Sequence, residues 1–392
     1  MQSCLELMLM TNYNLITKRP FSDKIGACVW PYYDDIADQV RLCASVGMKY
    51  VSAGVLFDRP NNFAAPTTEF TTMMDLAKQY NLTLMVDWTA TQTGSDSTTH
   101  SFWTTAELET IKTGVIDVIN QLKGLGTVYV GWNEPNGLFW LNDTTAAMTD
   151  YDTVKSSTDM QIWLAKQERS LDSSCTIGGP AFLYCPDYMV NNRTYVNLIN
   201  QMGLFKYVDA VSEHPYLAQS YDGGNPEQLI KYDNLGVTNL PKISNEFGYS
   251  RKVVDSNGWL GMWSQRDAAK LTIRQMLMMD YIGYSIITIY AGGLAKGNMD
   301  IFNSDGSLSY VAKSIKWLIS ELDGYTLDGK IEITEHVGYV DDLYLMKYTK
   351  NGAKDKLVYW TPSRMGELYG LVYEGNFYKL KFSDYPQILE VN

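Results

Sequence analysis

The chain has 392 residues, of which 45% are hydrophobic and 19% are charged, and its formal net charge is −12. This length and composition allow a large core, and they suit a barrel of ~250–300 residues with one accessory module. Because nucleic acids and anionic membranes bind basic surfaces, the acidic balance disfavours DNA, RNA and membranes as partners. No run reaches the ~18–20 apolar residues of a membrane span, and no signal peptide is identified, so we expect a cytoplasmic protein or one exported by a route that the sequence does not show.

Cysteine, histidine and aromatic residues narrow the chemistry further. The five cysteines form no CxxC pair and the three histidines are far apart, so we expect buried thiols, no disulfide framework, no metal site and no cofactor. Tyr and Trp number 28 and 10, and both suit sugar binding because each joins a flat apolar ring to a polar group. A large core also accounts for many of them.

Eight strand-like runs alternate with helical patterns between residues 24 and 323. Most of these runs are continuously apolar, which is typical of parallel strands buried on both faces. The predicted strands cover residues 25–30, 50–55, 83–87, 128–132, 176–179, 208–213, 242–245 and 285–290.

The segments between the strands have the spacing of amphipathic helices. Ile36, Val40 and Cys43 follow an i, i+4, i+7 pattern that stops at Gly47, and similar stripes run through residues 108–122, 273–281 and 311–322. Eight βα units of about 37 residues each favour an α/β fold closed into a (β/α)8 TIM barrel over residues 24–323. A doubly wound sheet is the rival, but no GxGxxG follows the first strand.

The pattern of the sequence changes from alternating strands and helices to short β-rich runs after residue 323. Short β-rich runs separated by turn signals predict a small antiparallel β-module over residues 324–392. Its predicted strands cover residues 331–335, 343–348, 356–361, 368–373 and 377–382. Residues 1–23 form an N-terminal segment that is a candidate to pair with this module.

The strongest local motif is a strand that runs directly into a glutamate. The apolar run 128–132 ends in Trp132 and is followed by Asn133, Glu134 and Pro135. Residues at the C-terminal ends of barrel strands face the active site, and Pro135 restricts the backbone of Glu134, so the carboxyl group is placed at a defined position. The alternative is a solvated glutamate in a turn.

A second strand, 242–245, ends in a glutamate in the same way, at Glu246. The alternative here is an acidic residue at a helix N-terminus. Glu134 and Glu246 are separated by about three repeats of ~37 residues, which places them at the ends of strands four and seven on one rim. Glycoside hydrolysis requires two carboxyl groups, one protonated and one ionised, and two neighbouring carboxylates raise the pKa of one of them.

Trp132-Asn133-Glu134-Pro135 at strand four and Glu246 at strand seven resemble the clan A retaining glycoside hydrolases. The resemblance covers residues 24–323. It implies that Glu134 is the catalytic acid/base, that Glu246 is the nucleophile, and that the mechanism retains anomeric configuration. Within the clan, the Trp-Asn-Glu-Pro-Asn motif and the small β-module look most like glycoside hydrolase family 39 and its relatives.

The same resemblance suggests substrate-binding residues. It implies that Asn133 hydrogen-bonds the sugar 2-hydroxyl, and that His214 or Tyr216, in the motif Ser-Glu-His-Pro-Tyr at strand six, contacts the nucleophile or the substrate. A buried structural His214 and a Tyr216 that merely packs at the rim are the alternatives. Glu213 is a rival carboxylate, but strand alternation points it away from the face that holds His214.

Strand ends and the loop after strand seven supply further candidates for sugar contacts, each of which has a packing role as its alternative. They are Trp30, Asp87, Trp88, Tyr290, Trp259 and Trp263.

Two positions depart from the clan pattern. Many members carry an arginine near the end of strand two that supports the nucleophile, whereas Arg59 lies further along the chain here. Many carry a tryptophan at the end of strand eight, where this chain has Tyr290. The sequence therefore does not identify the sugar.

We expect a retaining hydrolase that cleaves β-glycosidic bonds in an oligo- or polysaccharide, with a carbohydrate as its partner. The carboxyl groups of Glu134 and Glu246 should then lie about 5–5.5 Å apart. A non-catalytic carbohydrate-binding barrel and a transglycosylase are the alternatives.

Overall fold

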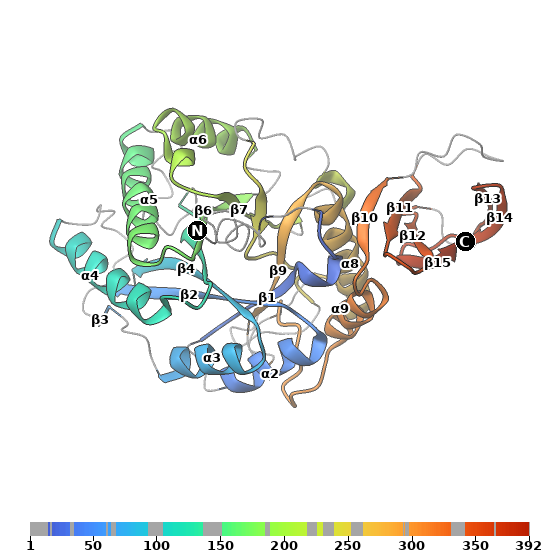
Figure 1. Ribbon diagram of the computed structural model, residues 1–392, viewed down its shortest axis with the longest axis horizontal. Helices are drawn as coiled ribbons and strands as arrows, with labels where there is room; N and C mark the ends of the chain where they lie inside the picture. The colour runs from blue at the N-terminus through green and yellow to red at the C-terminus, as the bar shows by residue number, and fades with distance from the viewer. Residues whose placement is uncertain are drawn as a thin grey trace, which may run out of the picture.

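The protein is a closed barrel of eight parallel strands with helices around it and a small antiparallel β-module at the C-terminus (Figure 1). The computed structural model describes residues 15, 18–31, 35–59, 62–63, 68–92, 105–135, 151–184, 189–217, 226–229, 239–251, 262–292, 294, 298–330, 342–363 and 366–391. The barrel strands follow the order β1-β9-β8-β7-β6-β5-β4-β2, and pairing of β1 with β2 closes the ring. The predicted (β/α)8 barrel with a C-terminal module is confirmed.

All eight predicted barrel strands are present. They are β1 (Ile25–Val29), β2 (Tyr50–Arg59), β4 (Thr83–Gln92), β5 (Val128–Trp132), β6 (Thr176–Tyr184), β7 (Ala210–Pro215), β8 (Lys242–Ser244) and β9 (Tyr284–Gly292). A short strand, β3 (Asn62–Phe63), pairs antiparallel with the end of β2. Strands four, six and seven of the predicted barrel are therefore β5, β7 and β8.

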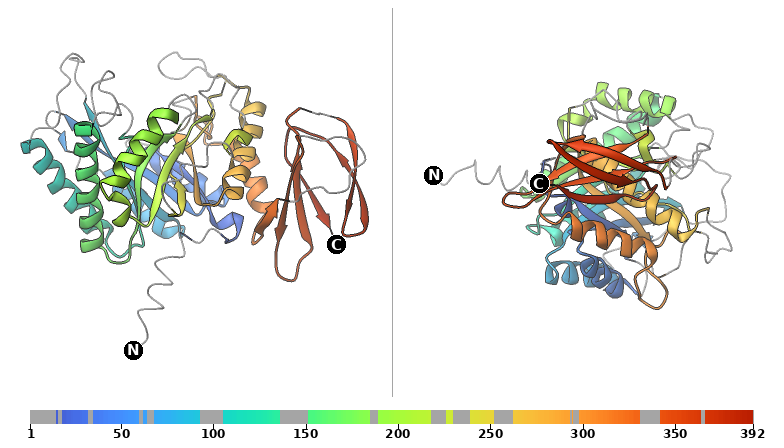
Figure 2. Two further views of the ribbon diagram at one scale, coloured as in Figure 1. Left: turned by 90° about the horizontal axis from the view of Figure 1, so that it is seen from above. Right: turned by 90° about the vertical axis from the view of Figure 1, so that its right-hand side faces the viewer.

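Helices cover the outside of the barrel (Figure 2). They are α2 (Ile36–Val46), α3 (Thr68–Gln79), α4 (Thr105–Leu122), α5 (Tyr151–Leu171), α6 (Met189–Gln201), α8 (Gln265–Tyr281) and α9 (Tyr310–Glu321), with 3-10 turns η2 (Phe21–Asp23), η4 (Leu204–Lys206) and η6 (Pro226–Gln228). Ile36, Val40 and Cys43 of α2 are buried against the strands, and Gly47 ends the helix with φ 96°, a left-handed conformation that suits glycine.

The barrel interior away from the C-terminal strand ends is filled by apolar side chains that alternate along the strands. Met85, Val130 and Ile243 belong to this cluster, and all three are fully buried. Arg19 bonds the hydroxyl of Tyr50, which belongs to the same cluster, and the carbonyl of Ser285. This part of the barrel interior is thus a packed core.

The C-terminal module contains two antiparallel sheets that pack on each other. One has the order β10-β11-β12-β15, and the other is the hairpin β13-β14. Their bounds are β10 (Thr326–Lys330), β11 (Tyr344–Thr349), β12 (Asp355–Trp360), β13 (Leu368–Tyr373), β14 (Asn376–Lys381) and β15 (Gln387–Val391). Four of the five predicted strands correspond to β11–β14, whereas the predicted strand 331–335 lies outside the described residues. The sequence analysis missed β10 and β15.

Buried polar contacts join the module to the barrel. On α8, Arg274 bonds Glu227 of η6, and the same carboxyl group accepts a hydrogen bond from Trp360 Nε1 on β12 at 2.5 Å. Nearby, Asp280 bonds the hydroxyl of Tyr348 at 2.8 Å and pairs with Lys24. The domain boundary at residue 323 and the pairing of residues 1–23 with the module stay predictions, because most of the N-terminal segment lies outside the described residues.

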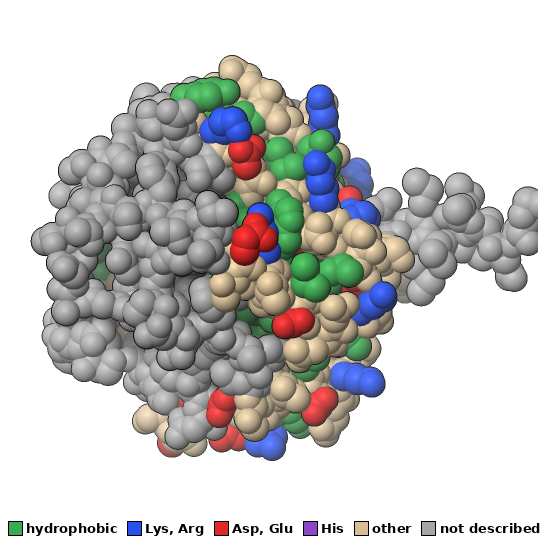
Figure 3. All heavy atoms as spheres, turned by 90° about the vertical axis from the view of Figure 1, so that its left-hand side faces the viewer, with side chains coloured by type: hydrophobic (Ala, Val, Ile, Leu, Met, Phe, Trp, Pro, Cys, Tyr) green, Lys and Arg blue, Asp and Glu red, His purple; other side chains and the backbone are tan. Residues whose placement is uncertain are grey.

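The described cysteines are free thiols, and the described surface carries charges of both signs. Cys28, Cys43 and Cys175 are buried and free, while Cys4 and Cys185 lie outside the described residues. Acidic and basic side chains are interspersed over the described part of the face shown in Figure 3. Within the described ranges, no helix is long and apolar enough to cross a membrane.

Candidate active site

Strand β5 contains an irregularity just before Glu134. Val86 and Trp88 of β4 are two residues apart, but their partners on β5, Tyr129 and Trp132, are three residues apart. One extra residue of this kind is a β-bulge, a feature that re-aims side chains at barrel rims. The bulge turns Trp132 outward into the core between strands and helices.

A glutamine from helix α5 supports this bulge. The Oε1 atom of Gln161 accepts a hydrogen bond from the Trp132 amide at 2.9 Å, and its Nε2 donates to the Trp132 carbonyl at 3.5 Å. A Cβ atom at Gly131 would meet Oε1 of Gln161 at 2.3 Å, so the glycine is required for this close approach. The side-chain amide therefore bonds both polar groups of the Trp132 backbone, two residues before Glu134.

Glu134 has an unusual backbone conformation. Its φ is 40°, in the left-handed region that non-glycine residues rarely occupy, and the following proline disfavours helical conformations. Such a conformation costs about 1–3 kcal/mol and persists where surrounding contacts impose it. Here the amide of Glu134 donates to the carbonyl of Ala181 at 2.8 Å, and the amide of Asn133 donates to the carbonyl of Trp88 at 2.8 Å.

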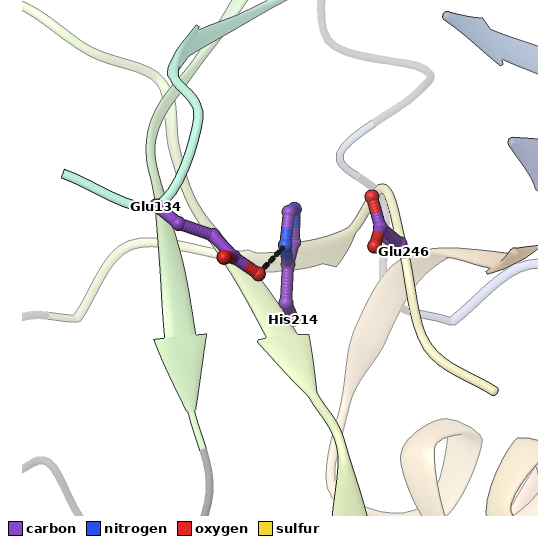
Figure 4. Close-up of side chains that lie close together, drawn as sticks. All are labelled: Glu134, His214 and Glu246. Carbon is purple, nitrogen blue, oxygen red and sulfur yellow. Dashed lines mark hydrogen bonds and ion pairs between the residues drawn. The ribbon is translucent and has the colours of Figure 1, made fainter. Parts of the chain in front are cut away.

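Glu134, His214 and Glu246 form one compact cluster at the rim (Figure 4). His214 lies between the two glutamates in the close-up, and its Nδ1 lies 2.9 Å from Oε1 of Glu134. An oxygen of each glutamate and a nitrogen of the histidine all lie within 4.8 Å of one another. The two residues that were predicted from strand ends far apart in the sequence thus face each other.

A second layer of polar residues lies on the other side of the imidazole. The Oδ1 atom of Asn245 lies 3.0 Å from His214 Nε2 and accepts a hydrogen bond from Ser212 at 2.7 Å. Its Nδ2 atom donates to Asp87 at 3.4 Å, and the hydroxyl of Thr89 donates to the same carboxyl group at 2.9 Å. Asp87 is therefore part of the cluster.

Tyr216 contacts the second glutamate, since its hydroxyl donates to Oε1 of Glu246. Burial raises the pKa of Glu246 to about 7, and the charges of Glu134 and Asp87 act in the same direction. The charge of His214 and the hydrogen bond from Tyr216 act against this rise. The charge of Glu134 thus disfavours ionisation of Glu246, whereas the charge of His214 favours it.

The charge state of His214 follows from its acidic neighbours. Burial opposes its charged form, but the charge of Glu246 and the hydrogen bond with Glu134 outweigh burial and raise its pKa to about 9. Burial likewise raises the pKa of Asp87, while the charge of His214 lowers it. At neutral pH the imidazole is thus a cation among three carboxyl groups.

The remaining predicted residues lie at different distances from this cluster. Asn133 is half-buried, and its Oδ1 is buried without a hydrogen-bond partner in the described part of the chain. Tyr290 ends on the same rim, where its amide donates to the carbonyl of Phe247, next to Glu246. Trp30 follows β1 and is half-buried, with its amide bonded to Gln39. Sugar contacts by these three residues stay predictions.

The structure contradicts the prediction for Trp88. Its side chain is fully buried outside the barrel, stacks on Tyr129 and donates to Glu168 of α5 at 2.8 Å. Because Asp87 points inward, its neighbour on the strand must point outward. Glu213 points away from His214 for the same reason, and its carboxyl group bonds Tyr284.

Trp263 packs half-buried against the core, and its amide donates to the carbonyl of Ser250 at 2.9 Å. None of its described contacts reaches the cluster, so its role as a subsite wall stays a prediction. Trp259 and the side chain of Arg59 lie outside the described residues.

The compact donor set of Glu134, His214 and Glu246 raises the question of a metal ion. A neutral imidazole nitrogen must offer a lone pair to a metal. Here Nδ1 of His214 faces Glu134 and Nε2 faces Asn245, and both contacts are at hydrogen-bond distance. The arrangement suits an imidazolium that donates two hydrogen bonds better than it suits a metal ligand.

Comparisons with known proteins bear on the fold. No family model and no curated protein matches the sequence. Among solved structures, SrfJ from Salmonella typhimurium has a TM-score of 0.61 and 11% identity over 95% of this chain and 89% of that chain. The endo-β1,6-glucanase BT3312 has a TM-score of 0.59 and 12% identity, over 95% of this chain and 91% of that chain.

A third similar structure is the glycoside hydrolase family 30 subfamily 8 xylanase Xyn30A from Clostridium acetobutylicum. Its TM-score is 0.52 and its identity 12%, over 94% of this chain and 93% of that chain. At such identities the likeness establishes the barrel with its C-terminal module and no activity. None of these three proteins is described as a family 39 enzyme, so that assignment stays a prediction.

Proposed function

We propose that this protein is a retaining glycoside hydrolase that cleaves β-glycosidic bonds in an oligo- or polysaccharide by double displacement. The observation that carries the proposal is the pair of carboxyl groups of Glu134 and Glu246, whose nearest oxygens lie within 4.8 Å. Retaining enzymes hold their two carboxyl groups about 5–5.5 Å apart, whereas inverting enzymes leave about 6.5–9.5 Å for a water molecule. The separation therefore favours retention.

The contacts of the two glutamates suggest their roles. Glu134 would give a proton to the glycosidic oxygen as the bond breaks, and Glu246 would attack the anomeric carbon to form a glycosyl-enzyme ester. Water would then attack this ester, its proton passing to Glu134 and its hydroxyl to the anomeric carbon. Tyr216, bonded to Glu246, holds the nucleophile in place. The unpartnered Oδ1 of Asn133 suits a hydrogen bond with the sugar.

The fold comparisons support the proposal at the level of clan A. Two of the similar structures are described as an endo-β1,6-glucanase and a family 30 xylanase. We do not extend their substrates to this chain, because Tyr290 replaces the tryptophan expected at the end of β9.

The test is a panel of aryl β-glycosides and β-linked polysaccharides, with the first product observed by proton NMR. We expect the first-formed hemiacetal to have the configuration of the substrate. Glu246→Gly should lose turnover. Added azide should restore turnover by replacing the missing carboxylate, and the product should be an α-glycosyl azide. Glu134→Ala with an activated aryl glycoside should give the β-glycosyl azide instead. Glu109→Ala, at an exposed position on α4, is the matched control.

Each remaining outcome of this experiment decides between the alternatives. An inverted product, or full activity in the Glu246 variant, would refute the proposed mechanism. Binding without product release would favour a carbohydrate-binding barrel. Transfer products that dominate at high sugar concentration would favour a transglycosylase.

A further inference from the structure

Asn245 is the polar residue directly before Glu246, and the sequence analysis assigns it no role. Its side chain is fully buried and contacts residues from two other strands of the barrel. Its Oδ1 meets Ser212 and His214, which both lie on β7, and its Nδ2 meets Asp87 on β4. A buried amide with both ends bonded has one favoured orientation.

The contact with Asp87 sets this orientation. Both oxygens of Asp87 accept hydrogen bonds, one from Thr89 and the other from the amide nitrogen of Asn245, so the amide oxygen of Asn245 faces His214. An amide oxygen only accepts, so Nε2 of His214 must carry a proton. The second nitrogen, Nδ1, faces Oε1 of Glu134 at 2.9 Å.

We propose that Asn245 is a positioning residue that keeps a proton on Nε2 of His214 and thereby holds the ring as an imidazolium whose Nδ1–H donates to Oε1 of Glu134. The inference rests on the proposed function, because it assigns a purpose to the state of Glu134. With Oε1 engaged as an acceptor, the proton that Glu134 donates as the proposed acid would be held on Oε2. There it can be given to the glycosidic oxygen.

The imidazolium also acts during the reaction. When Glu134 gives up its proton, the glycosidic C–O bond breaks and its electron pair stays on the departing oxygen. The new carboxylate of Glu134 then accepts a charge-assisted hydrogen bond from Nδ1–H. In the second half, water returns a proton to Glu134. His214 keeps both of its protons throughout.

A neutral His214 would work against this arrangement. Asn245 would keep the single proton on Nε2, and the lone pair on Nδ1 would draw the acid proton of Glu134 toward Oε1 and away from the sugar. The titratable groups that face the ring are Asp87 on β4, Glu134 after β5, Tyr216 after β7 and Glu246 after β8. The three acids raise the pKa of His214 to about 9, against the effect of its burial.

Nitrogen-15 NMR of the histidine rings tests the inference directly. The chain has three histidines, so His214→Gln assigns the signal. In the unaltered protein at neutral pH we expect both ring nitrogens protonated, and above the pKa we expect the Nε2–H tautomer. Asn245→Leu should lower the pKa of His214 and move the neutral proton to Nδ1, where Glu134 accepts it. Asn245→Asp keeps an oxygen acceptor and should raise the pKa.

Two leaving groups provide the kinetic test. Proton donation contributes about 10²–10⁴-fold for poor leaving groups, whereas a dinitrophenolate leaves without a proton. A neutral ring stabilises the carboxylate that forms on Glu134 less than an imidazolium does. Measured above the lowered pKa of His214, Asn245→Leu should therefore lower kcat/KM by at least about tenfold for an unactivated glycoside and by less than about threefold for the dinitrophenyl glycoside. Equal losses on both substrates indicate a merely structural role and overturn the inference.

The NMR experiment needs no turnover, so it separates the two proposals. A neutral Nδ1–H tautomer in the unaltered protein, or an unchanged His214 signal in Asn245→Leu, would overturn the positioning role even if the protein is a hydrolase. Absence of activity on every glycoside would refute the proposed function. The protonation state of His214 could still be determined from the NMR spectra. If Asn245→Leu does not fold, Asn245→Asp decides by the direction of the pKa change.

Discussion

Replacing Gln161 should disturb both the stability of β5 and the chemistry of Glu134. Gln161 is buried, 3% exposed, and its side-chain amide bonds both polar groups of the Trp132 backbone. In Gln161→Ala the Trp132 amide loses its partner at 2.9 Å while it remains buried. Leaving a buried donor unsatisfied costs about 1–3 kcal/mol, so the free energy of unfolding should fall by that amount.

The catalytic effect follows from distance along the chain. Glu134 is two residues beyond Trp132, and a displacement of about 1 Å at a reacting group costs about 10²-fold in rate. We therefore expect Gln161→Ala to lower kcat for an unactivated glycoside by about 10–100-fold. The guanidinium unfolding curve gives the stability, and initial rates on two leaving groups give the catalytic effect.

Gly131 supplies the decisive control. With Gln161 present, a Cβ atom added at this position would lie 2.3 Å from Oε1 of Gln161 and 3.1 Å from Cα of Pro180. Removing the glutamine side chain removes the shorter contact. Gly131→Ala should thus cost about 1 kcal/mol less in the Gln161→Ala background than alone, as measured by a double-mutant cycle. Additive effects, or an unchanged rate in Gln161→Ala, would refute the account of the bulge.

Three further changes have defined outcomes. Arg274→Met leaves Glu227 as a buried charge, 3% exposed, and should lower the free energy of unfolding by about 3–5 kcal/mol in denaturant titration, whereas adding Glu227→Leu should recover most of this loss. Tyr216→Phe removes a hydrogen bond that lowers the pKa of Glu246, so this pKa should rise above about 7. Because Glu246, as the proposed nucleophile, would attack only when ionised, the acid limb of kcat/KM should then move to higher pH. Dialysis against a chelator should leave activity unchanged, because both nitrogens of His214 are engaged; activity lost on dialysis and restored by zinc would contradict this.

The barrel could be predicted because its strands are buried on both faces and read as apolar runs. The lengths of these strands could not be predicted from the sequence. The predicted strand covers residues 176–179, yet β6 continues through Gly178 and Gly179 to Tyr184. These glycines are needed for close packing instead, since a Cβ at Gly178 would lie 2.5 Å from Ile243. Local composition does not distinguish a glycine that ends a strand from a glycine that lets a neighbouring side chain pack against the backbone.

The cluster could be predicted in part. Glu134, Glu246 and Asp87 follow from strand ends, because parallel strands bring their C-terminal ends to one rim. Strand alternation, which correctly turned Glu213 outward, would also have excluded Trp88 and identified Asn245, which has the same parity as the inward Ile243. Gln161 gave no signal, because its partner is reached only through the packing of α5 on β5.

Within the described residues, the cluster also shows which charge faces Glu246, the proposed nucleophile. A buried carboxylate needs a cation or several hydrogen bonds, or it takes up a proton. At this rim His214 is the positive charge that faces Glu246, and its cationic form is maintained by the very acids that it stabilises. The imidazole also bonds Glu134, so one side chain favours ionisation at the nucleophile and stabilises the carboxylate that forms at the acid.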